Sequence, residues 1–174
     1  NSTEYHSITQ NIKAAYVADA IFALELSPTT NPKRIIVLNK RNGALLFQTE
    51  ICPDDFFANG DKLFTIEGNS VIVYTLSSDM KSLSRTASMT MTGNDAFHLD
   101  HPSDLCVFDD DIVVADKNND RLALIDQSGV MTDIALEETP LAVTANSRDI
   151  YVAFANEVLR LSGGEIQKAY EATD

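Results

Sequence analysis

The sequence predicts an all-β fold: a β-propeller of four four-stranded antiparallel blades, forming a single domain over residues 1–174. Three observations predict it: a repeated turn-and-strand segment, a repeat length typical of propeller blades, and second strands that form continuous rather than alternating apolar runs. The repeated segment is a polar turn followed by β-branched and aromatic residues, a composition typical of strands. It occurs four times without gaps, at residues 19–24, 61–66, 110–115 and 148–153.

The repeat length follows from the equivalent residues Ile21, Leu63, Ile112 and Ile150, which are separated by 42, 49 and 38 residues. Propeller blades repeat every ~40–50 residues, so each segment marks the second strand of one blade. The flanking sequence places the blades at roughly residues 11–51, 53–92, 100–136 and 138–173.

The remaining strands of each blade repeat around these segments. A proline suits the first residue of a strand, because that position can lack a ladder donor. Prolines open blades two to four at Pro53, Pro102 and Pro140, before first strands at 56–58, 105–108 and 141–145. Third strands are predicted at 34–38, 71–76, 122–125 and 158–161. After a hairpin turn, more polar fourth strands follow at 44–51, 83–91, 130–136 and 165–172.

The second strands distinguish a propeller from a β-sandwich. Residues 112–115 read Ile-Val-Val-Ala and residues 21–24 read Ile-Phe-Ala-Leu, so their apolar residues are continuous rather than alternating. Continuous apolarity predicts burial on both faces. A sandwich sheet buries one face only, whereas a propeller blade is stacked between two others and has its middle strands covered on both sides.

Composition excludes several classes of partner. The chain has 26 acidic and 13 basic residues and a formal net charge of -13. Nucleic acids and anionic membranes require clustered Lys and Arg, so neither is expected to bind. No apolar run reaches the ~18 residues of a membrane-spanning helix. The first ten residues are polar, so no signal peptide is visible and the compartment stays open.

The two cysteines, Cys52 and Cys106, are too few for a disulfide framework or a cysteine-based zinc site. We expect two buried or half-buried thiols, because free cysteine is among the most buried residue types. The sequence leaves a single bridge between them open.

The third blade carries a family-like signature. Its parts are Pro102, Ile-Val-Val-Ala-Asp at 112–116, Asn-Asp-Arg-Leu at 119–122 and Asp-Gln-Ser-Gly at 126–129. This stretch resembles an NHL-type repeat. Because the other blades share little beyond the hydrophobic frame, the chain resembles the broad NHL-like or YVTN-like propeller group. Asp116 and Arg121 lie within reach of each other across a turn, and the resemblance implies that Asp116 is structural, tying loop backbone amides.

The repeat leaves ring closure open. Four blades can form a complete four-bladed ring, part of a six- to eight-bladed propeller, or half of an eight-bladed ring made by two copies. Residues 5–9 could pair as an outer strand, either for a preceding blade or as a closure strap on blade four. An unclosed half-propeller would expose two apolar blade faces. We therefore expect such a chain to associate with the remaining blades or with a second copy.

Two groups of residues could bind a metal, and each has a structural interpretation. His98, Asp100, His101 and Asp104 suit zinc, but residues three apart in an extended segment point to opposite faces and need not converge. Asp109 to Asp111 offer oxygen ligands for calcium, but Asp is also an ordinary turn former and the EF-hand pattern is absent. We therefore assign no metal or other cofactor.

The repeat favours one place for a ligand. Asp55 and Asp104 are equivalent residues near the axis, and His101 lies close to Asp104 in the sequence. We expect these three residues at one mouth of the central channel, where convergent polar groups would bind a ligand. No nucleophile elbow, Walker sequence or dinucleotide fingerprint is present, so no catalytic residue is assigned.

The sequence is compatible with two functions. The sequence favours a non-catalytic module that presents a rigid, loop-lined face to a protein or carbohydrate partner. The alternative is a metal-dependent enzyme of the lactonase or lyase kind, with a site in the central channel, as some propellers of the resembling group have. The chain has only three histidines, which gives little support to a lyase with several metal-bound histidines.

Overall fold

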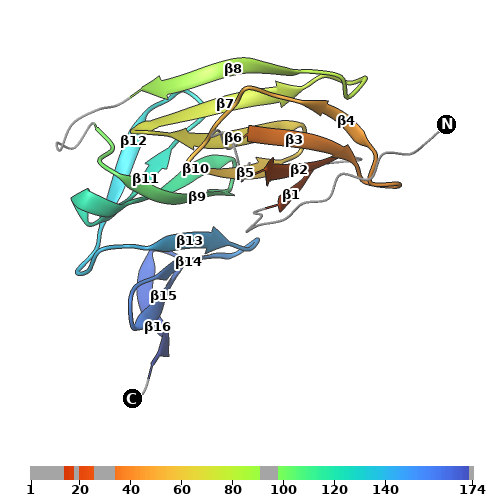
Figure 1. The fold of residues 1–174 in the computed structure, drawn as a ribbon. Helices are drawn as coiled ribbons and strands as arrows, with labels where there is room; N and C mark the ends of the chain where they lie inside the picture. The colour runs from red at the N-terminus through yellow and green to blue at the C-terminus, as the bar shows by residue number, and fades with distance from the viewer. Residues whose placement is uncertain (1–13, 18–19, 26–33, 91–97, 173–174) are drawn as a thin grey trace. The chain divides into compact units, whose positions relative to one another are not determined.

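The computed structural model describes residues 14–17, 20–25, 34–90 and 98–172. They form four antiparallel four-stranded sheets, and in each sheet the strands lie side by side in chain order (Figure 1). Each sheet is one of the predicted blades. The described part of the chain holds one helical turn, η1 (Lys117–Asn119). None of its helices is long and apolar enough to cross a membrane.

The strand bounds follow the predicted repeat. Blade one contains β1 (Ala14–Val17), β2 (Ala20–Glu25), β3 (Arg34–Asn39) and β4 (Leu45–Gln48). Blade two contains β5 (Asp55–Asn59), β6 (Lys62–Glu67), β7 (Ser70–Leu76) and β8 (Leu83–Thr90). Blade three contains β9 (Pro102–Phe108), β10 (Asp111–Asp116), β11 (Arg121–Ile125) and β12 (Met131–Ala135). Blade four contains β13 (Ala142–Ala145), β14 (Asp149–Ala153), β15 (Glu157–Ser162) and β16 (Glu165–Glu171).

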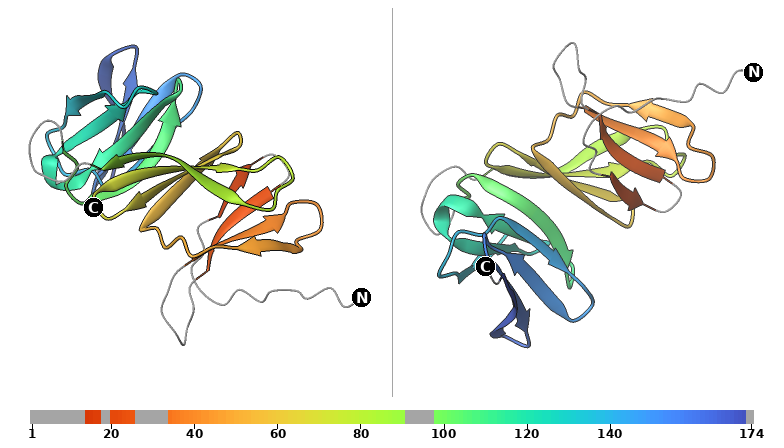
Figure 2. Two further views of the ribbon diagram at one scale, coloured as in Figure 1. Left: turned by 90° about the horizontal axis from the view of Figure 1, so that it is seen from above. Right: turned by 60° about the horizontal axis from the view of Figure 1, so that its bottom comes forward.

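The sequence-based bounds differ from these strands by a few residues at the ends. Pro102 is the first residue of β9, which begins three residues before the predicted strand at 105–108, whereas Pro53 and Pro140 each stand two residues before their strand. The predicted outer strand at residues 5–9 lies outside the described residues, as does part of blade one. Figure 2 shows the hairpin connections of the sheets from two further sides.

The chain divides into two compact units, residues 1–67 with 72–88 and residues 68–71 with 89–174. The first unit has a core in which residues of blades one and two pack together. Its fully buried side chains include Phe22, Ile35 and Val37 from blade one and Phe56 and Leu63 from blade two. Burial of such side chains is the main favourable term in folding.

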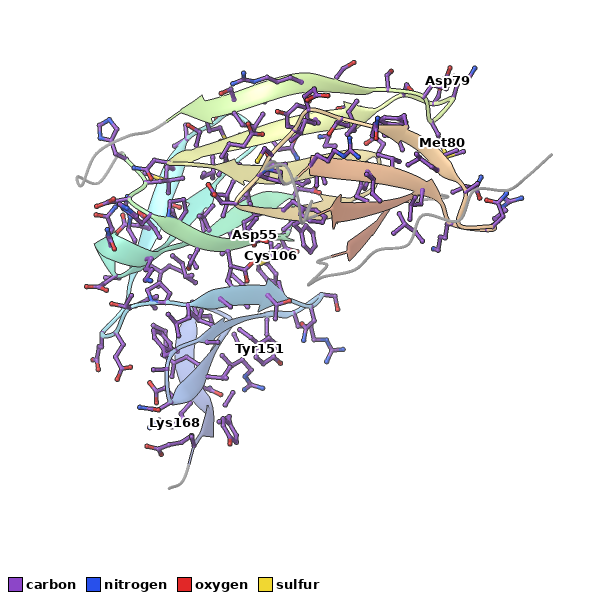
Figure 3. All side chains as sticks on the ribbon, in the orientation of Figure 1. Asp55, Asp79, Met80, Cys106, Tyr151 and Lys168 are labelled. Atoms are coloured by element: carbon purple, nitrogen blue, oxygen red, sulfur yellow. The ribbon has the colours of Figure 1, made fainter. Side chains whose placement is uncertain are left out.

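Blade three of the second unit confirms the expected two-sided burial. β10 is buried at five consecutive residues, Ile112 to Asp116. Strand neighbours point to opposite faces, so both faces of the blade are covered. On one of these faces, β13 of blade four packs against β9 and β10. Cys106 of β9 is buried on this face (Figure 3).

Blade four is different, because its second strand alternates. In β14, Ile150 and Val152 are buried, whereas Tyr151 and Ala153 are partly exposed. The outer strand β16 is exposed at every residue. Figure 3 shows Tyr151 and Lys168 on opposite sides of this blade. One face of blade four therefore packs on blade three, and no other described blade of the second unit packs on the opposite face, which we call the open face.

The cysteine prediction is half correct. Cys106 is buried, but Cys52 is exposed because it lies in the connection between β4 and β5 rather than in a strand. Neither thiol takes part in a disulfide bond. The bridge that the sequence left open is therefore not formed.

Candidate functional site

Polar side chains concentrate at one end of the second unit, which we call the connection end. It carries the β10–β11 turn, the segment 98–101 before β9, the connection 136–141 between blades three and four, and the β14–β15 turn at 154–156. These segments share an end because successive antiparallel strands reverse direction. The connection end is therefore where the loops of this unit could meet a ligand.

Asp116 organises the connection end. Its side chain is fully buried and both carboxylate oxygens are bonded. Oδ1 accepts the backbone N–H of Asp100 at 2.7 Å. Oδ2 accepts the Asn119 side-chain amide at 2.8 Å and Arg121 Nε at 2.8 Å. A buried carboxylate is tolerated only when it is paired and hydrogen-bonded in this way.

The same network holds the segment before β9. Asn119 Nδ2 donates to the backbone carbonyl of His98 at 3.0 Å, and Arg121 Nη2 donates to that carbonyl too. A register shift between Ala115 and Asp116 displaces the strand pairing at this point, a position at which bulges often re-aim a side chain. The structure confirms that Asp116 ties a loop amide and pairs with Arg121.

Asp120 ends the β10–β11 turn in a left-handed conformation, with φ of 48°. Its carboxylate accepts the Thr139 hydroxyl at 2.6 Å, which connects the turn to the segment that leads into blade four. Three loops of the connection end are therefore joined by side-chain hydrogen bonds.

His101 lies on the surface of this end, with its side chain 72% exposed. Its Nδ1 is 2.5 Å from Asp100 Oδ1 and 2.9 Å from Asn118 Nδ2. Its backbone N–H donates to Asn69 Oδ1 at 3.2 Å, and its φ of 52° is left-handed. The imidazole therefore caps the β10–β11 turn.

Asp104 makes a different contact. Its Oδ2 accepts the backbone N–H of Val143 at 2.9 Å, and its Oδ1 accepts the N–H of Leu105 at 2.9 Å. β13 is an edge strand, and an edge strand exposes backbone N–H groups. Asp104 thus provides a side-chain acceptor for such a group and ties blade four to blade three.

Asp55 lies at the start of β5 in the first unit, opposite Ile66 of β6. Asp104 occupies the same register position in blade three, opposite Ala115. The predicted equivalence of Asp55 and Asp104 is thus correct. That Asp55, Asp104 and His101 share one ligand site stays a prediction.

Among the described residues, no group of three or more His, Cys, Asp or Glu side chains is arranged to hold a metal ion. Asp109 and Asp110 have φ of 47° and 70° and form the β9–β10 turn, and Asp111 begins β10. Asp tolerates this left-handed conformation, so the turn-forming interpretation agrees with the structure.

A cavity of about 470 Å³ lies at the connection end between blades three and four. Such a volume is within the usual ~300–1,000 Å³ of ligand sites. Its lining combines five apolar side chains with three carboxylates and one amine: Ala135, Leu136, Phe154, Leu159 and Ile166, then Glu137, Glu138 and Glu157, then Lys168. We call this cavity the inter-blade groove.

Lys168 is the cation of the inter-blade groove. Its Nζ is 3.0 Å from Glu157 Oε2 and 3.2 Å from Glu171 Oε1. The hydrogen bond to Glu157, followed by the one to Glu171, raises the pKa of the Lys168 amine. The groove was not predicted from the sequence. Adjacent acids at Glu137 and Glu138 in an inter-blade connection are the one signal that could have drawn attention to it.

Comparison with known proteins shows the fold. No family model and no curated protein matches the sequence. Solved structures do match. A functionally unknown protein from Desulfotomaculum acetoxidans DSM 771 has a TM-score of 0.68 at 11% identity, over 93% of this chain and 56% of its own. A streptogramin B lyase structure has a TM-score of 0.66 at 16% identity, over 90% of this chain and 53% of its own.

A chain of a nidogen/laminin complex also matches, with a TM-score of 0.59 at 18% identity, over 91% of this chain and 62% of its own. These likenesses show that the chain has the β-propeller fold. The chain spans about half the length of the first solved structures that it matches. The matching structures include a lyase and a chain from a protein complex, so the fold is compatible with several functions.

Proposed function

We propose that this chain is a non-catalytic β-propeller binding module that presents the loops of its connection end to a protein partner. The observation that supports it best is the hydrogen-bond network of Asp116, Asn119, Arg121 and Asp120. It fixes three loops to one another. Binding costs less free energy when the contacting loops are ordered before the partner arrives.

The polar residues of this end also act on the protein itself. Asp116 and Asp104 accept backbone N–H groups, and His101 is hydrogen-bonded beside the β10–β11 turn. A carboxylate that accepts backbone N–H groups has fewer lone pairs for a substrate or a metal. These contacts favour a role in loop positioning over one in chemistry. A protein partner is preferred to a carbohydrate because the inter-blade groove combines apolar and acidic groups.

Affinity capture with matched variants tests the binding module. The connection-end variant exchanges two exposed charges, Lys117→Glu with Glu138→Lys, and leaves the net charge unchanged. The control makes the same exchange where the β5–β6 turn enters β6, Asp61→Lys with Lys62→Glu. We expect a partner that the control retains and the connection-end variant loses. Equal capture by both variants would contradict the proposal, and binding to a glycan array instead would identify a carbohydrate partner.

Metal analysis tests the enzyme alternative. The chain is purified without chelator, and its calcium and zinc contents are measured. Stoichiometric metal that is lost on Asp104→Ala or His101→Ala would favour a metal-dependent enzyme over the binding module. Metal contents that do not change between these variants would count against it.

We also propose that further blades complete the ring on the open face of blade four. Register pairing places Ala142, Tyr151, Ala153 and Val158 on this face. The equivalent face of blade three is covered: Val113, Ala115 and Leu122 are fully buried there, beside the packed β13. A shallow apolar depression of about 260 Å³ lies on the open face. The chemistry of this surface suits the apolar face of another blade.

A further inference from the structure

The inter-blade groove has an apolar floor. Phe154 is only 6% exposed, and Leu159 and Leu136 are partly buried beside it. At the outer side, Ile166 of β16 is 48% exposed. An exposed isoleucine next to a buried phenylalanine offers an apolar surface that a side chain from another molecule can cover.

The rim of the groove is acidic. Glu137 and Glu138 are exposed in the connection between blades three and four, and Glu157 lies opposite them in blade four. Lys168 is bonded to Glu157 and Glu171. No ion pair among the described residues involves Glu137 or Glu138. The groove therefore has two carboxylates available to a cation. Both add to the negative electrostatic potential of the chain.

The walls of the groove are held in place. Thr139 is hydrogen-bonded to Asp120, and the amide of Leu136 donates to the backbone carbonyl of Asp120 at 2.9 Å. On the other wall, the amide of Phe154 donates to the carbonyl of Glu157 at 2.9 Å. A cavity between two hydrogen-bonded walls is formed before its ligand binds, which lowers the entropic cost of binding.

We propose that the inter-blade groove binds a short peptide segment in which a Lys or Arg stands next to a large apolar residue. The apolar side chain covers Ile166 and Phe154, and the cation lies between Glu137 and Glu138. Electrostatic complementarity of this kind favours basic segments and rejects acidic ones. This inference rests on the proposed binding function and identifies the chemistry of its partner.

A tryptophan peptide gives a direct test. The chain has no tryptophan, so the indole of an added peptide can be observed selectively. The probe is acetyl-Lys-Trp-Leu-Arg-amide, and its counterpart is acetyl-Glu-Trp-Leu-Glu-amide. We expect saturable binding of the basic peptide with a blue-shifted indole emission, because the indole enters an apolar site. The acidic peptide should not bind.

Three variants assign the binding to the groove. Glu137→Gln with Glu138→Gln should weaken binding about tenfold, since two charge contacts are lost. Asp109→Asn with Asp110→Asn removes the same charge from the β9–β10 turn, where Asn tolerates the left-handed conformation, and should leave binding unchanged. Ile166→Ser should weaken binding at least threefold, because apolar contact is lost at an already exposed residue. Circular dichroism checks that each variant is folded.

The proposal is wrong if neither peptide binds, if both bind equally, or if the two double variants weaken binding alike. Self-association that Ile166→Ser abolishes, without peptide binding, would assign the groove to a second copy and also overturn it. The capture experiment separates the two proposals in each case. A partner whose capture requires Lys117 and Glu138 but not Ile166 would support the binding module and refute the peptide site.

Discussion

Asp116 shows what a buried charge requires at the scale of one residue. Its carboxylate is fully buried and is matched by Arg121, whose side chain is 6% exposed. Two further donors, the Asn119 amide and the Asp100 N–H, bring the hydrogen bonds that the carboxylate accepts to three. The pair stabilises the folded state only as a set, because removal of one member leaves the other charged, buried and unpaired.

Asp116→Ala should therefore lower the free energy of unfolding by about 3 kcal/mol or more. Chemical denaturation measures this loss of free energy of unfolding. Asp133→Ala is the control, because Asp133 is an exposed residue of β12 and should change stability by less than about 0.5 kcal/mol. Equal losses in the two variants would show that the Asp116 network contributes little.

Tyr74 couples stability to pH in the first unit. Its hydroxyl donates to Glu67 Oε1 at 2.9 Å, and that oxygen also accepts the Thr65 hydroxyl at 2.8 Å. Burial, followed by the bond to Glu67, raises the pKa of Tyr74 from 10.0 to about 12. The folded state therefore holds the phenol proton more tightly than the unfolded state does. The resulting stability is present below pH 10 and is lost as the pH rises through about 12.

Tyr74→Phe should flatten this part of the pH dependence. Denaturation at several pH values from about 9 to about 12 measures how the free energy of unfolding changes with pH. This range covers the shift of the Tyr74 pKa from 10.0 to about 12. Tyr170→Phe is the matched control, because Tyr170 is 61% exposed. An unchanged slope in Tyr74→Phe would mean that other groups determine the alkaline loss of stability.

At the scale of strands, the Asp104 side chain accepts a backbone N–H of the edge strand β13. β13 has a strand on one side only, and the Asp104 carboxylate bonds Val143 N–H. A hydrogen bond to a charged acceptor contributes ~1.5–3 kcal/mol, more than a neutral one. This contact connects two blades of the second unit through a single side chain.

Asp104→Ala should expose the Val143 amide. We expect its hydrogen exchange to accelerate at least tenfold, because protection depends on that bond. Amides in the centre of β11 serve as the internal reference, since they belong to blade three and do not depend on β13. Exchange of Val143 at the original rate would mean that another group protects it.

At the scale of the whole molecule, we expect the open face of blade four to govern the association of the isolated chain. This face carries two partly exposed residues, Tyr151 and Val158, and the largely exposed Tyr170. The residues of blade three equivalent to Tyr151 and Val158 are Val113 and Leu122, and both are fully buried. An apolar sheet face of this kind associates with another surface. The formal net charge of -13 opposes self-association but leaves the apolar surface of this face in contact with water.

Light scattering of the isolated chain should therefore show association that increases with concentration. Val158→Lys should reduce it, because a charge on the open face must be desolvated on association. Val130→Lys is the control, since Val130 is 59% exposed in a turn away from this face. A monodisperse species with the mass of one chain at all concentrations would contradict the open-face proposal.

Much of the fold could be predicted because strand burial is visible as residue pattern. The continuous apolar run at 112–115 predicted two-sided burial, and β10 is buried on both faces. The Asp116 and Arg121 contact was also predictable, because the two residues lie on either side of one short turn. Hydrophobicity and short sequence separation were sufficient for both.

The candidate site was harder to predict, because its contacts join residues distant in sequence. Asp104 accepts the backbone N–H of Val143, which is 39 residues away, and the spacing of residues does not indicate this contact. The inter-blade groove depends on the packing of two blades, and Lys168 reaches Glu157 across β15 and β16. Apart from the adjacent acids Glu137 and Glu138, neither the spacing of residues nor their composition indicates these contacts.

The sequence by itself determined the four repeated sheets, the position of nearly every strand and the pairing of Asp116 with Arg121, because strand periodicity and local turns depend on neighbouring residues. Only the tertiary structure decided that blade four is covered on one face, that Asp104 ties two blades together and that an acidic groove lies between them. These properties depend on which surfaces meet when blades stack, and the stacking is set by shape and side-chain direction rather than by the order of residues along one strand.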